Sequence, residues 1–326
     1  MHQARRTSAT ISGPPLANKV LHAWRLAIFV GAAIYPGTPL WAEQPPQVAS
    51  ATSPRKLPDR IPTTLLQEML AIHRVVGSPG LAWKNQSHVV TVAFNGGSDD
   101  LYALIENTAK EWTNLGGQLQ FSFKDNSGHY RQWSTSDNRQ AANLRISFTD
   151  GDGFWSLLGV LAKNVAPNEP TMNFEGFPTT LQGYFHGQNT SQWLKTYEHS
   201  TILHEFGHAL GLSHEHFHPQ CQTDLKIKTI IIYLQGPPNN WSEQQARFNM
   251  DAAYYFDALG RRAGPLDSHS VTSPRPDQAS VMLYSFPADF YDTGNTSICK
   301  SVGDSGKDYP TTLSAGDKAF YLVNYK

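Results

Sequence analysis

Apolar and β-branched residues recur with a period near two in several short stretches, which is typical of strands with one buried face. After the first stretch, apolar positions recur at helical spacing behind Ser98, a residue that can cap the start of a helix. The order strand, helix, strand, strand, strand, helix predicts a mixed α+β layer architecture. The expected strands lie within residues 88–94, 118–123, 143–148 and 171–174.

A further helical pattern begins near residue 200, where Ser200 or Thr201 can cap a helix with apolar residues along one side. His204 and His208 are four residues apart on it, so both imidazoles project from the same face. We expect this helix to stop at Gly211, because glycine adopts the left-handed conformation that ends helices without steric cost.

The turn at Gly211 lets the chain double back and present His214 as a third imidazole. Three neutral imidazoles and a water form the open tetrahedral site that is typical of catalytic zinc. Glu205 follows the first histidine and is placed to reach a water without being a ligand. A lone pair of histidines on a helix is more often structural. The added glycine and third histidine make a chance match rare.

The motif His-Glu-x-x-His-x-x-Gly-x-x-His over residues 204–214 resembles the long zinc signature of the metzincin metallopeptidases. That superfamily also carries a methionine turn beneath the metal, which Ser-Val-Met-Leu-Tyr at residues 280–284 resembles. The resemblance implies that Met282 is a packing floor under the zinc histidines. Without this context, a single methionine would be interpreted as an ordinary residue of the hydrophobic core.

Within the metzincins, Glu215 after the third histidine and Tyr284 two residues past Met282 are most similar to the astacin family. Leu212 stands where animal astacins usually have phenylalanine, and most of their cysteines are missing. The serralysins also have the tyrosine. The helix motif of this chain also resembles that of the matrixins, which lack the tyrosine. In astacins, the glutamate matching Glu215 helps to anchor the mature N-terminus, and it is not expected to contact zinc.

The resemblance implies a metzincin-like (zincin) α+β fold for residues 84–326. This fold has a twisted, mostly parallel sheet with the active-site helix, and an irregular C-terminal subdomain ending in a helix. Residues 171–174 would be the edge strand to which a peptide substrate adds. Residues 313–317, Leu-Ser-Ala-Gly-Asp, would open the last helix. The insertion at 217–279 resembles no known motif and is expected to shape the primed side of the cleft.

The implied activity is zinc-dependent hydrolysis of peptide bonds in protein or peptide substrates. One zinc ion would be held by His204, His208 and His214, with Glu205 as general base and Tyr284 as donor to the oxyanion. The alternative is a catalytically weak zinc-binding protein that uses the fold to bind extracellular protein or peptide. The intact Glu205 argues against it, because a structural zinc site has no need of a base.

The N-terminus carries basic residues, then an apolar run of about ten residues, then small residues around Ala42, which is the pattern of a secretory signal. The run is too short to span a bilayer, where about 20 residues are needed. We expect residues 1–42 to be a signal peptide, with no stable membrane insertion after its removal, and the protein to be secreted (extracellular or periplasmic). A buried helix or an uncleaved anchor is the alternative. The proline-rich residues 43–83 are expected to be an exposed linker or pro-segment.

Composition narrows the remaining choices. A formal net charge of −1 argues against nucleic acid as a partner. In an exported chain Cys221 and Cys299, the only two cysteines, are expected to pair, with two buried free thiols as the alternative. Two lesser expectations concern other sites. Calcium is conceivable at the acidic turns of 150–153 and at Asp304, although plain turns are favoured, and solvent-exposed positions are expected for His199, His216 and His218.

Overall fold

The computed structural model describes residues 57, 59–62, 81–83, 88–258, 274–304 and 306–326. The expected signal peptide lies outside the described residues, and so does most of the expected linker. In the part that is described, no helix is both long and apolar enough to cross a membrane.

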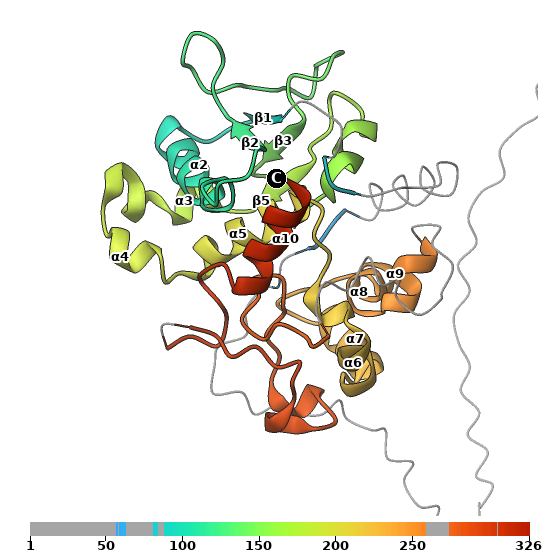
Figure 1. Cartoon of the computed structure of the whole chain (residues 1–326). Coiled ribbons are helices and arrows are strands. Elements are labelled where there is room, and N and C mark those ends of the chain that lie inside the picture. Colours follow the sequence, from blue (N-terminus) through green and yellow to red (C-terminus); the bar gives the residue numbers. More distant parts are fainter. Residues whose placement is uncertain (1–56, 58, 63–80, 84–87, 259–273, 305) are drawn as a thin grey trace, which may run out of the picture. The chain divides into compact units, whose positions relative to one another are not determined.

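The centre of the fold is a five-stranded sheet in the order β2-β1-β3-β5-β4 (Figure 1). Its first four strands run parallel, and β4 pairs with β5 in the antiparallel sense. The mostly parallel sheet expected from the resemblance is therefore confirmed. The strands are β1 (Val89–Phe94), β2 (Gln120–Ser122), β3 (Leu144–Ser147), β4 (Phe154–Ser156) and β5 (Met172–Phe174).

The edge of this sheet differs from the sequence-based prediction. Residues 171–174 do form a strand, but β5 lies between β3 and β4, so the edge strand on this side is β4. All three residues of β5 are buried, as expected of a strand inside a sheet. The prediction that 171–174 is the edge strand is wrong because residue patterns report the burial of a short strand and not its place in the sheet order.

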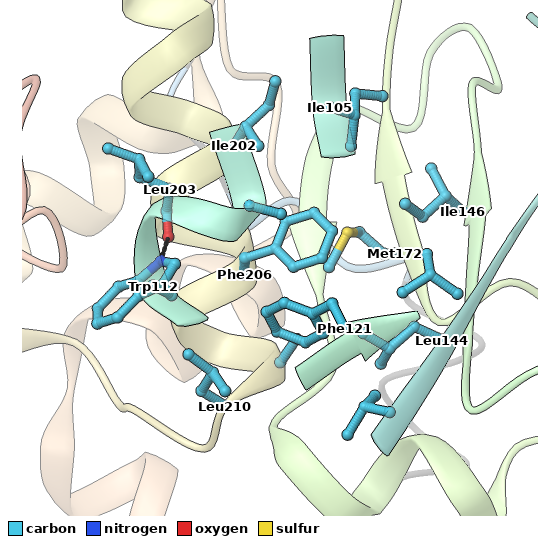
Figure 2. Close-up of a cluster of buried hydrophobic side chains, with 14 of the residues drawn as sticks. Ile105, Trp112, Phe121, Leu144, Ile146, Met172, Ile202, Leu203, Phe206 and Leu210 are labelled. Carbon is cyan, nitrogen blue, oxygen red and sulfur yellow. Dashed lines mark hydrogen bonds between the residues drawn. The ribbon is translucent and has the colours of Figure 1, made fainter. Parts of the chain in front are cut away.

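Two helices pack together in the main core. Ser98 accepts a hydrogen bond from the backbone N–H of Leu101 and caps α2 (Asp99–Thr113), as predicted. The second helix, α5 (Tyr197–Ala209), carries the histidine motif. Figure 2 shows Phe206 of α5 among side chains from the sheet, and the Trp112 indole N–H donating to the Leu203 carbonyl at 2.9 Å. These contacts anchor the motif helix to the core.

The start of α5 was predicted four or five residues too late. Its N-cap is Thr196, whose hydroxyl accepts from the backbone N–H of His199, so Ser200 and Thr201 lie inside the helix. Their hydroxyls instead donate to backbone carbonyls of other residues. The helix ends where expected: α5 stops at Ala209, and Gly211 has φ of 98°.

The C-terminal part is built from short helices and loops, as expected of an irregular subdomain. A disulfide between Cys221 and Cys299, which are 78 residues apart, ties its beginning to its later loops and confirms the predicted pairing. The last helix is capped by Ser314 in a capping box with Asp317, which confirms the opening predicted at 313–317. The longer helices of this part are α6 (Pro219–Asp224), α7 (Ile227–Gln235), α8 (Glu243–Met250), α9 (Ala252–Ala258) and α10 (Ala315–Asn324).

The remaining helical segments are single turns or short 3₁₀ pieces that connect the larger elements. They are η1 (Gly159–Asn164), α3 (Phe177–Thr180), η2 (Gln182–Gly187), α4 (Thr190–Trp193), η3 (Glu215–Phe217), η4 (Ala288–Phe290) and η5 (Gly294–Thr296).

Candidate metal centre and active site

Three buried imidazoles converge on one point, and a carboxylate lies at that point. The Nε2 atoms of His204 and His214 are 2.9 and 2.8 Å from Oδ2 of Asp59, and Nε2 of His208 is 3.0 Å from Oδ1. One donor atom from each of these residues lies within 4.8 Å of the other three. The three histidines predicted from the motif are thus brought together, with a fourth residue that the motif did not include.

The donor atoms of this cluster fit a metal ion. Nδ1 of His204 faces the Val281 carbonyl at 2.6 Å, and Nδ1 of His208 faces the Leu212 carbonyl at 2.7 Å. Since a carbonyl only accepts hydrogen bonds, each Nδ1 carries its proton, and in the neutral ring the Nε2 lone pair points at the Asp59 carboxylate. The contact with the Asp59 carboxylate calls for positive charge, supplied either by a second proton on the rings or by a metal ion held by the Nε2 atoms. Three imidazoles with one carboxylate suit zinc.

The turn beneath the histidines supports α5 closely. The sulfur of Met282 lies so near α5 that a Cβ at Gly207 would be 2.4 Å from it and would displace the thioether. Met282 is buried, and its carbonyl accepts a hydrogen bond from the N–H of Glu215 at 3.0 Å. The motif helix, the methionine turn and the chain after the third histidine therefore form one packed unit.

Asp317 at the start of α10 holds the methionine turn from below. Its carboxylate accepts hydrogen bonds from the Ser280 hydroxyl at 2.7 Å and from the Val281 N–H at 3.0 Å. Because the Val281 carbonyl in turn orients His204, the last helix is connected to the candidate ligand through two hydrogen bonds. This connection is the kind of outer support that fixes a ligand's orientation.

Glu205 is the predicted general base, and its carboxylate lies fully buried beside the histidines. Neither oxygen has a hydrogen-bond partner among the described residues. Burial raises the pKa of Glu205 well above its usual range, and the neighbouring charge of Asp59 raises it further. The backbone N–H of Asp59 acts in the opposite sense and partly lowers the pKa, so the segment that carries Asp59 lies against Glu205.

Tyr284, the predicted oxyanion donor, reaches the same point from the methionine turn. Its hydroxyl donates to Oδ2 of Asp59, and its ring lies 4.7 Å from that of His214, centroid to centroid. Burial raises the pKa of Tyr284 well above 10, and the Asp59 charge adds to this. The phenol is therefore a hydrogen-bond donor at neutral pH.

Asp59 is the site residue that sequence reasoning missed. It was predicted to lie in an exposed linker, yet Leu57, Asp59 and Ile61 are all buried. Burial opposes ionisation of Asp59, but the surrounding histidines outweigh it and hold its pKa well below the usual range. The available signal was apolar residues at alternate positions around an acid, which is too short a pattern to separate from the proline-rich background.

Two neighbouring histidines also differ from expectation. His199 and His216 are buried rather than solvent-exposed. His199 faces Glu111, with Nε2 2.7 Å from the carboxylate, and the His216 ring stacks 4.7 Å from His214. Glu215 accepts from the N–H of Asp277, and burial raises its pKa to about 7. Histidine spacing alone could not distinguish packing partners from surface residues.

The expectation of calcium remains a prediction. The Asp304 carboxylate accepts hydrogen bonds from the Thr311 N–H and hydroxyl and from the Thr312 hydroxyl. Among the residues that the structure describes, the cluster of Asp59 and the three histidines is the one group of ligating side chains close enough to hold a metal ion.

Comparison with known proteins agrees with the motifs. No protein-family model matches the chain. The zinc metalloproteinase nas-24 of Caenorhabditis elegans is 22% identical over 167 residues, which are 51% of this chain, and the match spans only 41% of that relative. The solved structure of myroilysin is 26% identical, with a TM-score of 0.51 over 77% of this chain and 96% of that one. The chain is thus similar in sequence and fold to zinc metalloproteinases of the astacin type, as its motifs indicated.

Proposed function

We propose that the protein is a secreted zinc endopeptidase in which His204, His208 and His214 hold the metal. The observation that carries the proposal is the convergence of three Nε2 atoms beside a buried carboxylate, Glu205, that has no hydrogen-bond partner among the described residues. Zinc bound there would polarise the scissile carbonyl and acidify a water.

The chain's own groups would carry the proton and the charge. Glu205 takes a proton from the attacking water and passes it to the departing amine, a role favoured by its buried place beside the three histidines. Tyr284 donates a hydrogen bond to the oxygen that gains negative charge, and such a donor is typically worth about 3 kcal/mol. Its place beside His204 and His214 supports this role.

Asp59 would keep the full-length chain inactive. Its carboxylate fills the point that substrate must reach and contacts all three histidines and Tyr284. We therefore assign residues 43–83 to a pro-segment whose removal or cleavage opens the site. The full-length wild-type chain should hydrolyse casein only after limited cleavage by trypsin, because the main-chain contacts of Leu57, Asp59 and Ile61 keep the segment in place until it is cut. An untreated chain that hydrolyses casein as fast as the treated one would contradict this assignment.

Secretion rests on two observations. The N-terminal residues carry the basic, apolar and small residues of a signal peptide in the right order. The Cys221–Cys299 disulfide suits an oxidising compartment. N-terminal sequencing of the protein recovered from the medium or periplasm should begin near Glu43. A mature chain that retains residues 1–42 would contradict the proposal.

The direct test of the activity compares wild-type protein with Glu205→Ala, both treated briefly with trypsin that is then inhibited. Zinc content should be equal, and casein hydrolysis should fall by about 10²–10⁴ in the variant. An undiminished rate would exclude Glu205 as the base. A wild-type protein that binds zinc but cleaves no peptide of a broad library would instead favour the non-catalytic binding protein.

A further inference from the structure

Three carboxamide side chains form hydrogen bonds with the main chain of the segment that carries Asp59. Oδ1 of Asn239 accepts from the N–H of Leu57 at 2.8 Å. Nδ2 of Asn249 donates to the carbonyl of Asp59, also at 2.8 Å. The third contact runs from Nε2 of Gln245 to the carbonyl of Ile61 at 2.5 Å. The contacts fall on every second residue of the segment and touch only backbone atoms, so they do not depend on which side chains it carries.

These carboxamides are fixed in place by their own surroundings. Asn239, Gln245 and Asn249 are all buried. Oε1 of Gln245 accepts from the N–H of Ser242 in the capping box of α8, which leaves its Nε2 for the segment. Asn249 lies one turn further along the same helix and also donates to the Gln245 carbonyl. Gln245 and Asn249 are therefore each held by a second hydrogen bond at α8.

Removal of the segment would leave these groups without their partners. A buried polar group that loses its hydrogen bond costs about 1–3 kcal/mol. Nδ2 of Asn239 already has no partner among the described residues, so this amide has a donor to spare. A peptide that follows the same turned path as residues 57–61 presents N–H and C=O groups that can replace the segment's contacts.

An apolar pocket lies beside the same contacts. Ile61 is 4% exposed and belongs to a hydrophobic cluster with Leu158, Phe248 and Tyr255. The same three residues line a cavity that also reaches His208 and His214. A side chain two residues from the one that faces the metal therefore enters an aliphatic and aromatic pocket next to two candidate ligands.

The edge of the sheet touches this chain as well. The N–H of Arg60 donates to the carbonyl of Phe154 in β4 at 3.0 Å, so one backbone hydrogen bond joins the segment to the edge strand. Asp59 has φ of 69°, and its carbonyl also accepts from the N–H of Ile61, so the backbone is sharply turned at the metal-facing residue. Backbone capture by a sheet edge, with a pocket that selects a side chain, is a known mode of peptide recognition.

We propose that Asn239, Gln245 and Asn249 bind the main chain of the peptide substrate. The Ile61 pocket then selects an aliphatic side chain in that substrate. This inference rests on the proposed function and names its substrate class: polypeptide with a branched apolar residue two positions from the one that faces the three histidines.

The first experiment measures KM and kcat of the trypsin-treated full-length protein on a quenched fluorescent peptide. Gln245→Glu keeps the oxygen that caps α8 and loses the donor, so KM should rise about tenfold with kcat within about threefold. The matched control is Gln235→Glu, an exposed amide at the end of α7, which should leave both constants unchanged. Equal KM values for Gln245→Glu and Gln235→Glu would overturn the proposal.

A second experiment does not depend on hydrolysis. A labelled peptide of residues 55–63 is titrated into the zinc-loaded, trypsin-treated protein, and fluorescence anisotropy gives its affinity. Methylation of the Leu57 nitrogen should weaken binding about tenfold to wild type and not at all to Asn239→Leu. Asn239→Asp, which keeps the acceptor, should behave as wild type. An equal loss in wild type and Asn239→Leu would overturn the Asn239 contact.

The pocket is tested with the same titration. Peptides with valine or leucine at the Ile61 position should bind within about threefold of the parent, and those with aspartate or glycine should bind at least about tenfold more weakly. Indifference to this position would overturn the pocket. A protein that binds these peptides but hydrolyses nothing would refute the proposed peptidase activity alone, so the two failures are distinguishable.

Discussion

The two walls of the cleft are specified by the sequence in different ways. One wall is α5, where two candidate ligands and the base lie within five consecutive residues of a single helix. The other wall is built by α8 and the loop before it, which contact residues 57–61 across long separations in sequence. Asn239 contacts a residue 182 positions away, and Asn249 one 190 positions away.

The two walls differ in role: α5 carries the residues proposed for the chemistry, and α8 with its preceding loop carries those proposed to recognise the peptide. Helical periodicity alone places His204 and His208 on one face, so the metal chemistry can be recognised in a short stretch of sequence. The carboxamides act only after distant segments have folded together, and asparagine or glutamine at these positions has no local pattern. Breaking either wall should therefore produce a different kind of failure.

The largest effect is expected from His208→Ala in the α5 wall. It removes one of three nitrogen ligands, so bound zinc should be lost and casein hydrolysis by the trypsin-treated protein should fall by more than about 10⁴. Zinc content by mass spectrometry and the hydrolysis rate check this. His129→Ala, on an exposed turn, is the control and should retain both. Full zinc content in His208→Ala would be incompatible with the ligand set.

The disulfide tests the opposite wall. Replacing Cys221 and Cys299 by serine opens a loop closed over 78 residues, and the chain-entropy model gives a loss of about 4–5 kcal/mol in the free energy of unfolding. Urea unfolding measures this loss. A reductant should lower the stability of wild type to a similar level and leave the double variant unchanged. An unaltered unfolding midpoint would show that the bridge does not stabilise the subdomain.

Tyr284→Phe probes the group that reaches from the methionine turn to the α5 wall. Loss of one oxyanion donor should lower kcat about 10²–10³, or about 3–4 kcal/mol, with zinc content unchanged. Tyr233→Phe in α7 serves as the matched control. Since Tyr284 also contacts Asp59, kinetics must be measured after trypsin treatment. An unchanged kcat would assign Tyr284 a purely structural role.

The smallest effect concerns the packing of α5 on the methionine turn. Gly207→Ala places a Cβ 2.4 Å from the Met282 sulfur, and the flexible thioether must move to admit it. We expect a loss of about 1 kcal/mol in the free energy of unfolding, since the crowding exceeds the gain in helix propensity. Gly183→Ala, with no neighbouring atom within 4 Å, is the control. A stabilised Gly207→Ala would contradict the close contact.

The sequence predicted those parts of the molecule whose signals are local. The strand at β1, the helix capped by Ser98, the turn at Gly211 and the disulfide all have the positions or partners expected. The mostly parallel sheet followed from the resemblance, and the structure has it.

The wrong predictions share one physical cause: each concerns a feature that is set by tertiary neighbours and not by the local sequence. The place of β5 inside the sheet depends on β4 folding back beside it. The helix begins after Thr196 rather than after Ser200, about one turn earlier than the sequence pattern indicated. The burial of Asp59 depends on three histidines more than 140 residues away, and no periodicity in the proline-rich stretch could report it.

The proposed activity depends most on a single zinc ion lying where the three imidazoles meet. Anomalous diffraction from crystals of the zinc-loaded protein, collected on both sides of the zinc absorption edge, tests it directly. We predict one strong peak within bonding distance of Nε2 of His204, His208 and His214, with Met282 packed beneath. A peak elsewhere, or three rings turned away from one another around no peak, would contradict the account.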